Sequence, residues 1–206
     1  SSGPRKFKVR FLAEYNDILR ADWSNHPYKP ALRKVSPPFT VNWVMSPPRS
    51  GGGHQNIFRF INFMEEQGHT CRVYLYSATE KPTIKELREG MRDYYPSGEA
   101  SMEWLEGGMK PADAVFATGW ETAYPVFNDK GGARKFYFVQ DFEPLFYPVG
   151  SEYILAENTY RMNFYGITAG GWLSHKLSSD YGMRCDHYDF GTDSNLYRFE
   201  NSSKRR

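Results

Sequence analysis

Short apolar runs and amphipathic stretches alternate along most of the chain. Runs rich in β-branched and aromatic residues predict buried strands at 39–45, 69–76, 112–119, 135–140, 166–170 and 185–191. Between them, apolar residues recur every three or four positions and predict helices at 56–67, 82–95, 121–127, 151–165 and 171–182. Strands and helices that alternate in this way predict the α/β class, with a Rossmann-like, doubly wound and mostly parallel sheet.

Several helix boundaries carry recognisable end signals. Gly68 and Gly182 follow helical stretches and are predicted to close them. Pro82 suits a first helical turn, and Ser151 is expected to be an N-cap.

The first 38 residues follow a different pattern. Phe7, Phe11, Tyr15 and Ile18 have helical spacing, and a proline-rich stretch comes after them. We therefore divide the chain into an N-terminal helix and linker (1–38), a Rossmann-like domain (39–199) and the start of a linker or tail (200–206).

Composition narrows the function classes further. The net charge of +2 is too small to argue for nucleic acid, since acidic and basic residues are interleaved. No apolar run approaches the roughly 18 residues of a membrane helix, and no signal peptide is visible, so a cytoplasmic protein is expected. Basic residues within 1–34 are explained most simply as a solvated face, with peripheral contact to anionic lipid at the inner membrane face as the alternative. The two cysteines are expected to be reduced.

A glycine-rich turn stands between the first strand and the first helix of the domain. It reads SGGGHQN and contains Gly51, Gly52, Gly53 and His54. Backbone N–H groups at such a helix start, together with the helix dipole, favour an anion such as phosphate. The alternative is a tight turn that needs glycine for its backbone angles alone. The string is neither GxGxxG nor a Walker loop, which lowers the expectation of a dinucleotide or P-loop enzyme.

Polar and aromatic residues follow the predicted strands, where ligands gather in open α/β sheets. They are Trp120, Glu121 and Thr122, then Gln140, Asp141 and Glu143, and finally Trp172. Carboxylates bind hydroxyls and aromatic rings cover C–H faces, so this set suits a sugar. Each residue also has a plainer explanation, as part of the core or as a helix or loop cap. The five histidines show no metal-ligand spacing, and no protein-bound metal is expected.

Four strings together resemble the N-terminal domain of family 4 glycosyltransferases of GT-B architecture, especially rhamnosyltransferases that act on surface glycans. They are SPPRSGGGHQNIFRF, ADAVFATGWETAYPV, KFYFVQDFEPLFYPVGSEY and the terminal FGTDSNLYRF. The resemblance implies that Trp120, Glu121, Thr122 and Trp172 bind the glycan acceptor, and that the loop Gly51–Gly53 with His54 approaches the donor diphosphate. It implies dTDP-rhamnose as donor substrate, no bound cofactor, and a second GT-B domain that holds the nucleotide. The isolated chain is then expected to be inactive.

Two functional questions stay open from the sequence. Asp141, Gln140 and Glu143 are the candidates for a catalytic role, but Gln140 stands where many relatives have histidine, and an amide is no general acid near neutral pH. A non-catalytic glycan- or nucleotide-binding module is the main alternative function. A small-molecule α/β enzyme, such as a reductase or a flavodoxin-like protein, is the third.

Overall fold

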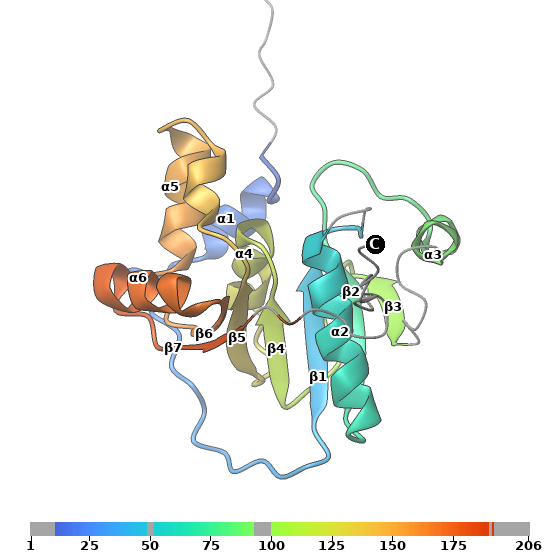
Figure 1. Ribbon diagram of the computed structural model, residues 1–206. Helices are drawn as coiled ribbons and strands as arrows, with labels where there is room; N and C mark the ends of the chain where they lie inside the picture. Colours follow the sequence, from blue (N-terminus) through green and yellow to red (C-terminus); the bar gives the residue numbers. More distant parts are fainter. Residues whose placement is uncertain (1–10, 49–51, 93–99, 190, 192–206) are drawn as a thin grey trace, which may run out of the picture.

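The computed structural model describes residues 11–48, 52–92, 100–189 and 191. Its centre is a seven-stranded sheet in which every neighbouring pair is parallel, in the order β3-β2-β1-β4-β5-β6-β7 (Figure 1). The strands are β1 (Thr40–Met45), β2 (Thr70–Leu75), β3 (Ser101–Trp104), β4 (Ala114–Ala117), β5 (Arg134–Val139), β6 (Tyr165–Ala169) and β7 (Cys185–Tyr188). The order reverses beside β1, as in doubly wound α/β proteins, so the expected Rossmann-like fold class is confirmed.

Helices cover both faces of this sheet. They are α1 (Tyr15–Arg20), α2 (Gly52–Glu66), α3 (Ile84–Met91), α4 (Trp120–Asn128), α5 (Ser151–Thr159) and α6 (Gly171–Tyr181), with a short 3-10 turn at Glu143–Phe146. One core contains side chains of α2 and α3, and the other contains side chains of α4, α5 and α6. Successive residues of β1 alternate between them: Trp43 and Met45 point to the α2 side, and Val44 points to the α4 side. This explains why the strands are apolar almost throughout.

Local signals set several helix ends. Thr83 accepts a hydrogen bond from the Glu86 amide, and the Glu86 carboxylate accepts one from the Thr83 amide, so a capping box starts α3. Gly68 and Gly182 have φ angles of +86° and +65°, which confirms both as the residues that close α2 and α6.

Several features differ from the sequence-based prediction. Strand β3 was not predicted, because it has only four residues and its outward positions are polar. Helix α5 ends at Thr159 rather than 165, since Asn163 takes a left-handed conformation (φ +67°) before β6 begins. Gly150, not Ser151, is the N-cap of α5. Of the expected N-terminal helix, only Tyr15–Arg20 is helical among the described residues, since residues 11–14 take no helical conformation.

The N-terminal helix is tied to the sheet through one tyrosine hydroxyl. Tyr76 follows β2 in the chain. Its hydroxyl donates to Asp17 Oδ2 at 2.8 Å and accepts from the Glu14 amide at 2.7 Å. Asn128 of α4 adds a bond from its Nδ2 to the Asp17 carbonyl at 2.9 Å. These bonds pack helix α1 against the end of β2 and against α4.

Replacing Tyr76 with phenylalanine is expected to lower the free energy of unfolding by about 1 kcal/mol, because two hydrogen bonds lose their common partner. Urea unfolding measures this. Tyr15→Phe is the matched control, since it also removes a tyrosine hydroxyl, but from an exposed side chain of α1 itself. Equal stability of Tyr76→Phe and Tyr15→Phe would contradict the anchoring role of the hydroxyl.

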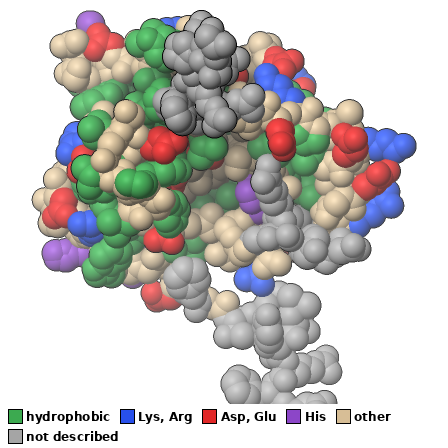
Figure 2. Space-filling view, turned by 90° about the horizontal axis from the view of Figure 1, so that it is seen from above, with side chains coloured by type: hydrophobic (Ala, Val, Ile, Leu, Met, Phe, Trp, Pro, Cys, Tyr) green, Lys and Arg blue, Asp and Glu red, His purple; other side chains and the backbone are tan. Residues whose placement is uncertain are grey.

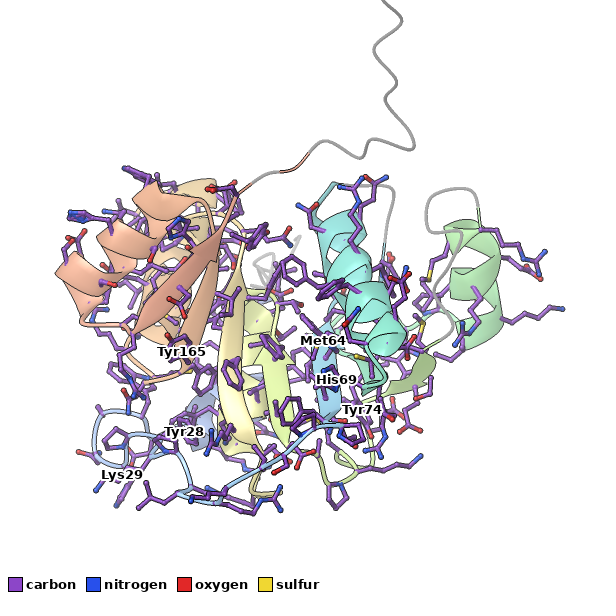
Figure 3. All side chains as sticks on the ribbon, turned by 60° about the horizontal axis from the view of Figure 1, so that its bottom comes forward. Tyr28, Lys29, Met64, His69, Tyr74 and Tyr165 are labelled. Atoms are coloured by element: carbon purple, nitrogen blue, oxygen red, sulfur yellow. The ribbon has the colours of Figure 1, made fainter. Side chains whose placement is uncertain are left out.

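From residue 22 to residue 38 the chain runs as a strap along the edge where the strands begin (Figure 3). The Tyr28 hydroxyl accepts a bond from the Lys135 amide at 3.1 Å, and the Tyr28 carbonyl accepts one from Asn163 at 2.7 Å. Arg33 pairs with Asp113 at 2.7 Å just before β4. These contacts fix the strap across the starts of β4, β5 and β6.

Within the described residues, no helix is long and apolar enough to span a bilayer.

Candidate functional site

The carboxyl ends of the strands meet at one edge of the sheet, and a pocket of about 310 Å³ opens there. Figure 2 looks down on this edge. The walls of this pocket include the segments directly after β1 and β2 and the first turns of α2 and α4. The lining residues are Leu12, Ser46, Pro47, Pro48, His54, Tyr76, Ser77, Thr79, Glu80, Pro82, Leu87 and Glu121.

The glycine-rich turn leads into α2 beside this pocket. Gly51 lies outside the described residues, and Gly52 is the first residue of the helix. Gly52 is exposed, and a Cβ added there would meet nothing within 4 Å. A side chain at this position is therefore compatible with the fold, so the fold by itself does not require glycine here.

His54 is held in the pocket wall by the end of β1. Its Nε2 lies 3.1 Å from the Ser46 carbonyl oxygen and 3.4 Å from the Ser46 hydroxyl. A carbonyl oxygen can only accept, so the ring carries its proton on Nε2 in this contact. The imidazole thus has a defined orientation at the pocket.

Gln140 joins the end of β5 to the start of α2. Its Nε2 donates to the Gly53 carbonyl at 3.0 Å, and its Oε1 accepts from Asn56 Nδ2 at 3.3 Å. A Cβ at Gly53 would lie 3.3 Å from this Nε2, so Gly53 leaves room for the contact. Both ends of the amide contact the chain itself, which gives Gln140 a structural task at the position considered for catalysis.

Asp141, the next residue, is exposed. Its Oδ1 accepts from the Phe142 amide at 3.0 Å and stabilises the turn that follows β5. The rest of the carboxylate faces solvent at the same edge as the pocket, and its catalytic role stays a prediction.

Glu143 sits at the start of α4, although it belongs to the 3-10 turn after β5. Its Oε2 accepts from the Trp120 amide at 2.9 Å, and its Oε1 accepts from the Tyr137 hydroxyl at 3.0 Å. It therefore supplies the N-terminal hydrogen bond that α4 lacks from its own cap residue, Gly119.

The carboxyl groups of Glu121 and Glu143 are neighbours, and both residues are half-buried. Burial, and then the charge of Glu121, raise the pKa of Glu143 to about 8, and burial raises the pKa of Glu121 as well. The Glu121 carboxylate folds back over Gly119, where an added Cβ would lie 2.7 Å from its Oε2. Two neighbouring carboxyl groups of this kind retain a proton near neutral pH. The raised pKa of Glu121 favours its protonated form, which can donate as well as accept a hydrogen bond at the pocket wall.

Trp120 and Thr122 were expected to contact the acceptor, and the structure places both inside. The Trp120 side chain is 1% exposed, and its Nε1 donates to the Tyr147 hydroxyl at 2.9 Å. Thr122 is fully buried, and its hydroxyl accepts from the Thr118 and Gly119 amides. A sugar cannot stack on a ring that is already covered, so Trp120 supports α4 from within.

Trp172 is the second residue of α6, after the end of β6, and it is 67% exposed. It does not line the pocket. Its ring is available to a ligand at this edge, but the structure does not bring it together with His54 and Glu121.

The pocket thus joins two predicted residues, His54 and Glu121, to several that sequence reasoning missed. Ser46 follows β1, and Ser77 and Thr79 follow β2. Their position after apolar strands was the available signal, the same one that pointed to Glu121 and Gln140. In the part of the chain that the structure describes, no group of three or more His, Cys, Asp or Glu side chains is placed to hold a metal ion.

Comparison with known proteins adds to this geometry. Residues 106–169 match the family model described as WsaF, N-terminal domain. This part of the chain is similar to the N-terminal domain of WsaF. The matched span runs from before β4 to the end of β6 and includes Glu121, Gln140, Asp141 and Glu143. The chain is also similar to the O-antigen biosynthesis protein RfbC of Myxococcus xanthus, with 29% identity over 178 residues. That alignment covers 81% of this chain and 14% of RfbC, so the chain spans a small part of this relative.

Proposed function

We propose that this chain is the acceptor-binding half of a glycosyltransferase that builds a surface polysaccharide such as an O-antigen. The match to the WsaF N-terminal domain supports the enzyme class, and the printed name of RfbC supports the kind of product. The fold agrees, because ligands of open α/β sheets bind outside the carboxyl ends of the strands.

The observation that carries the proposal is the chemistry of the pocket at those ends. Three hydroxyl groups (Ser46, Ser77 and Thr79), the His54 ring and the Glu121 carboxyl line it. Its apolar wall includes Pro47, Pro48 and Leu87. Sugars present hydroxyls at their edges and C–H groups on their faces, so a mixed lining of this size suits one or two sugar units.

The donor enters from the side of α2 in this proposal. The exposed start of α2 at Gly52 and Gly53 supplies backbone N–H groups and the positive end of the helix dipole to a diphosphate. The resemblance of the sequence to rhamnosyltransferases makes dTDP-rhamnose the proposed donor, held mainly by a second GT-B domain, with no protein-bound metal or cofactor. The reaction would take place at the inner face of the membrane, where the growing glycan is attached.

Glu121 is proposed to hydrogen-bond the acceptor hydroxyl. Its carboxyl lines the pocket, and its raised pKa favours a protonated form that can donate or accept according to the orientation of that hydroxyl. Gln140 is engaged by Gly53 and Asn56, and its proposed task is to hold α2 in register with β5.

A transfer assay on the complete natural polypeptide tests this function. Purified protein is incubated with radiolabelled dTDP-rhamnose and rhamnose-containing acceptor glycan, and Glu121→Gln is compared with wild type. A glutamine amide has one fixed donor atom and one fixed acceptor atom, whereas a protonated carboxyl group can place its donor on either oxygen. We therefore expect the KM of Glu121→Gln for the glycan acceptor to rise roughly tenfold, with the KM for the donor unchanged. Glu66→Gln, an exposed glutamate at the far end of α2, is the matched control.

Two results would overturn the proposal. Equal acceptor KM values for Glu121→Gln and wild type would remove Glu121 and its pocket from acceptor binding. Glycan binding without transfer from any nucleotide-sugar by the complete polypeptide would instead favour a non-catalytic binding module.

A further inference from the structure

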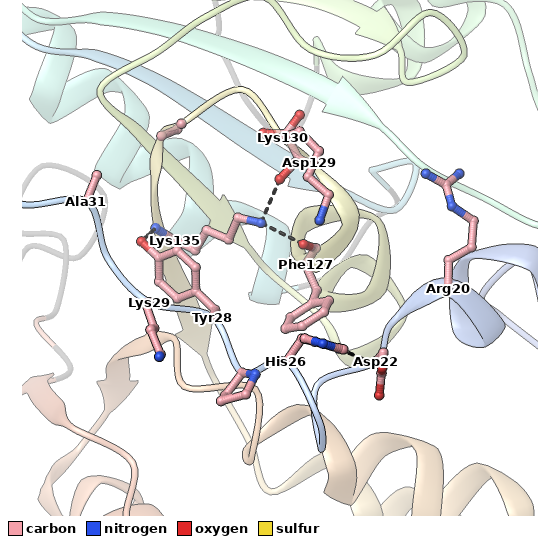
Figure 4. A pocket seen from close by; sticks show the side chains of 13 residues that line it. Arg20, Asp22, His26, Tyr28, Lys29, Ala31, Phe127, Asp129, Lys130 and Lys135 are labelled. Carbon is pink, nitrogen blue, oxygen red and sulfur yellow. Dashed lines mark hydrogen bonds and ion pairs between the residues drawn. The ribbon is translucent and has the colours of Figure 1, made fainter.

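A second and larger pocket lies at the opposite edge of the sheet, where the strands begin (Figure 4). Its volume is about 410 Å³. One wall is the strap, another is the end of α1, and the floor is the loop between α4 and β5. The lining residues are Arg20, Asp22, His26, Pro27, Tyr28, Lys29, Ala31, Phe127, Asp129, Lys130, Gly132, Ala133 and Lys135. None of the residues proposed for glycosyl transfer is among them.

The floor is organised around a buried lysine. Lys135 is 7% exposed, and its Nζ donates to the Phe127 carbonyl at 2.6 Å and to the Asp129 carbonyl at 2.8 Å. It lies over the Tyr28 and Phe127 rings, at 5.3 and 5.7 Å from their centroids. Burial lowers the pKa of Lys135 to about 8, so the ammonium form still predominates at neutral pH. The charge neutralises the negative end of α4, which would otherwise face the pocket.

The remaining charges of the lining are unbalanced. Both carboxylates are engaged by neighbours: Asp22 by Asn25 and His26, and Asp129 by the Gly131 amide. Within the described part of the chain, the side chains of Arg20, Lys29 and Lys130 have no hydrogen-bond or ion-pair partner. Three free cations therefore surround a cavity whose own acids are already satisfied.

We propose that this strap pocket binds a phosphate-bearing ligand, separately from the site of glycosyl transfer. A phosphate group is attracted by the positive charges that Arg20, Lys29 and Lys130 add to the lining of the pocket. The organic part of the ligand would lie against the rings of Tyr28 in the strap and Phe127 in α4. A soluble phosphate ester and a phospholipid headgroup share this chemistry, and the test separates them.

The experiment titrates the chain with inorganic pyrophosphate and follows amide chemical shifts by NMR. We expect saturable changes in the amide shifts of Tyr28, Phe127 and Gly132. Added salt should weaken the binding, because it screens the attraction between charges. The double substitution Lys29→Ser with Lys130→Ser should weaken binding roughly tenfold, because two exposed charge contacts are lost. Both lysines are exposed, so the fold should tolerate their removal. Lys85→Ser, an exposed lysine of α3, is the control and should bind like wild type.

A second arm uses vesicles of phosphatidylcholine with and without phosphatidylglycerol. Lysine-dependent binding to the anionic vesicles alone identifies the phosphate source as a lipid headgroup, and lysine-dependent binding of pyrophosphate alone identifies a soluble ligand. Absence of both, or equal loss in the Lys85→Ser control, would overturn the proposal. Neither arm measures glycosyl transfer, so a failure of the phosphate-site proposal is distinct from a failure of the proposed function.

Discussion

Gly52→Val is expected to reduce glycosyl transfer by the complete polypeptide at least about 100-fold while leaving the fold intact. The loss follows from the proposed donor site, since a β-branched side chain at the start of α2 would occupy the space that a diphosphate needs. The intact fold follows from the structure, because a Cβ at Gly52 meets nothing within 4 Å. Transfer of labelled sugar and urea unfolding of the same preparation measure the two effects.

Gly90→Val is the matched control for this change. Gly90 is also an exposed glycine of a helix with no atom near an added Cβ, but it lies in α3 rather than at the start of α2. We expect this variant to transfer sugar like wild type, with equal or slightly higher stability, because valine has a higher helix propensity than glycine. Near-normal turnover by Gly52→Val would show that the donor does not approach this turn.

The second large effect concerns pH. The free energy of unfolding of the wild-type chain should fall by about 3 kcal/mol as pH rises from 5 to 8. Burial and the charge of Glu121 raise the pKa of Glu143 to about 8, whereas an unfolded glutamate ionises near its ordinary value of 4.5. Between these two values the folded chain holds a proton that the unfolded chain has lost, so stability is highest at the acid end. Glu143→Gln keeps a neutral acceptor beside the Trp120 amide and should remove most of this slope.

Chemical denaturation at a series of pH values from 5 to 8 measures the slope for both proteins. Glu66→Gln serves as the control, because the exposed Glu66 side chain has no buried partner. A slope in Glu143→Gln as steep as in wild type would mean that the carboxyl pair of Glu121 and Glu143 does not retain its proton.

The fold could be predicted from the sequence because its signals are local. Strands such as β1 and β2 are buried on both faces, so their apolar runs stand out, and Gly68 and Gly182 mark helix ends by their backbone conformation. Strand β3 gives no such signal because it is a short edge strand with polar outward positions. The end of α5 was misplaced for a similar reason: Asn163 is held by the strap through the Tyr28 carbonyl, a contact far away in sequence.

The site was predicted less completely than the fold. Strand ends indicated the edge of the sheet at which the pocket lies, where His54 and Glu121 line it and Gln140 contacts Gly53. The sequence did not show which way α4 is rotated, and this rotation turns Trp120 and Thr122 into the core while Glu121 reaches the pocket. Three predicted parts lie outside the described residues: Gly51, the terminal string FGTDSNLYRF apart from its Gly191, and the tail 200–206. The roles assigned to the site residues stay predictions until they are measured.

The proposed function depends most on whether a glycan acceptor binds at the carboxyl ends of β1 and β2. Titration of the isotopically labelled chain with a rhamnose-containing oligosaccharide, followed by NMR, tests this binding directly. We expect the largest shift changes at Ser46, His54, Ser77, Thr79 and Glu121. Changes centred on the strap pocket instead, or no change at millimolar oligosaccharide, would contradict it.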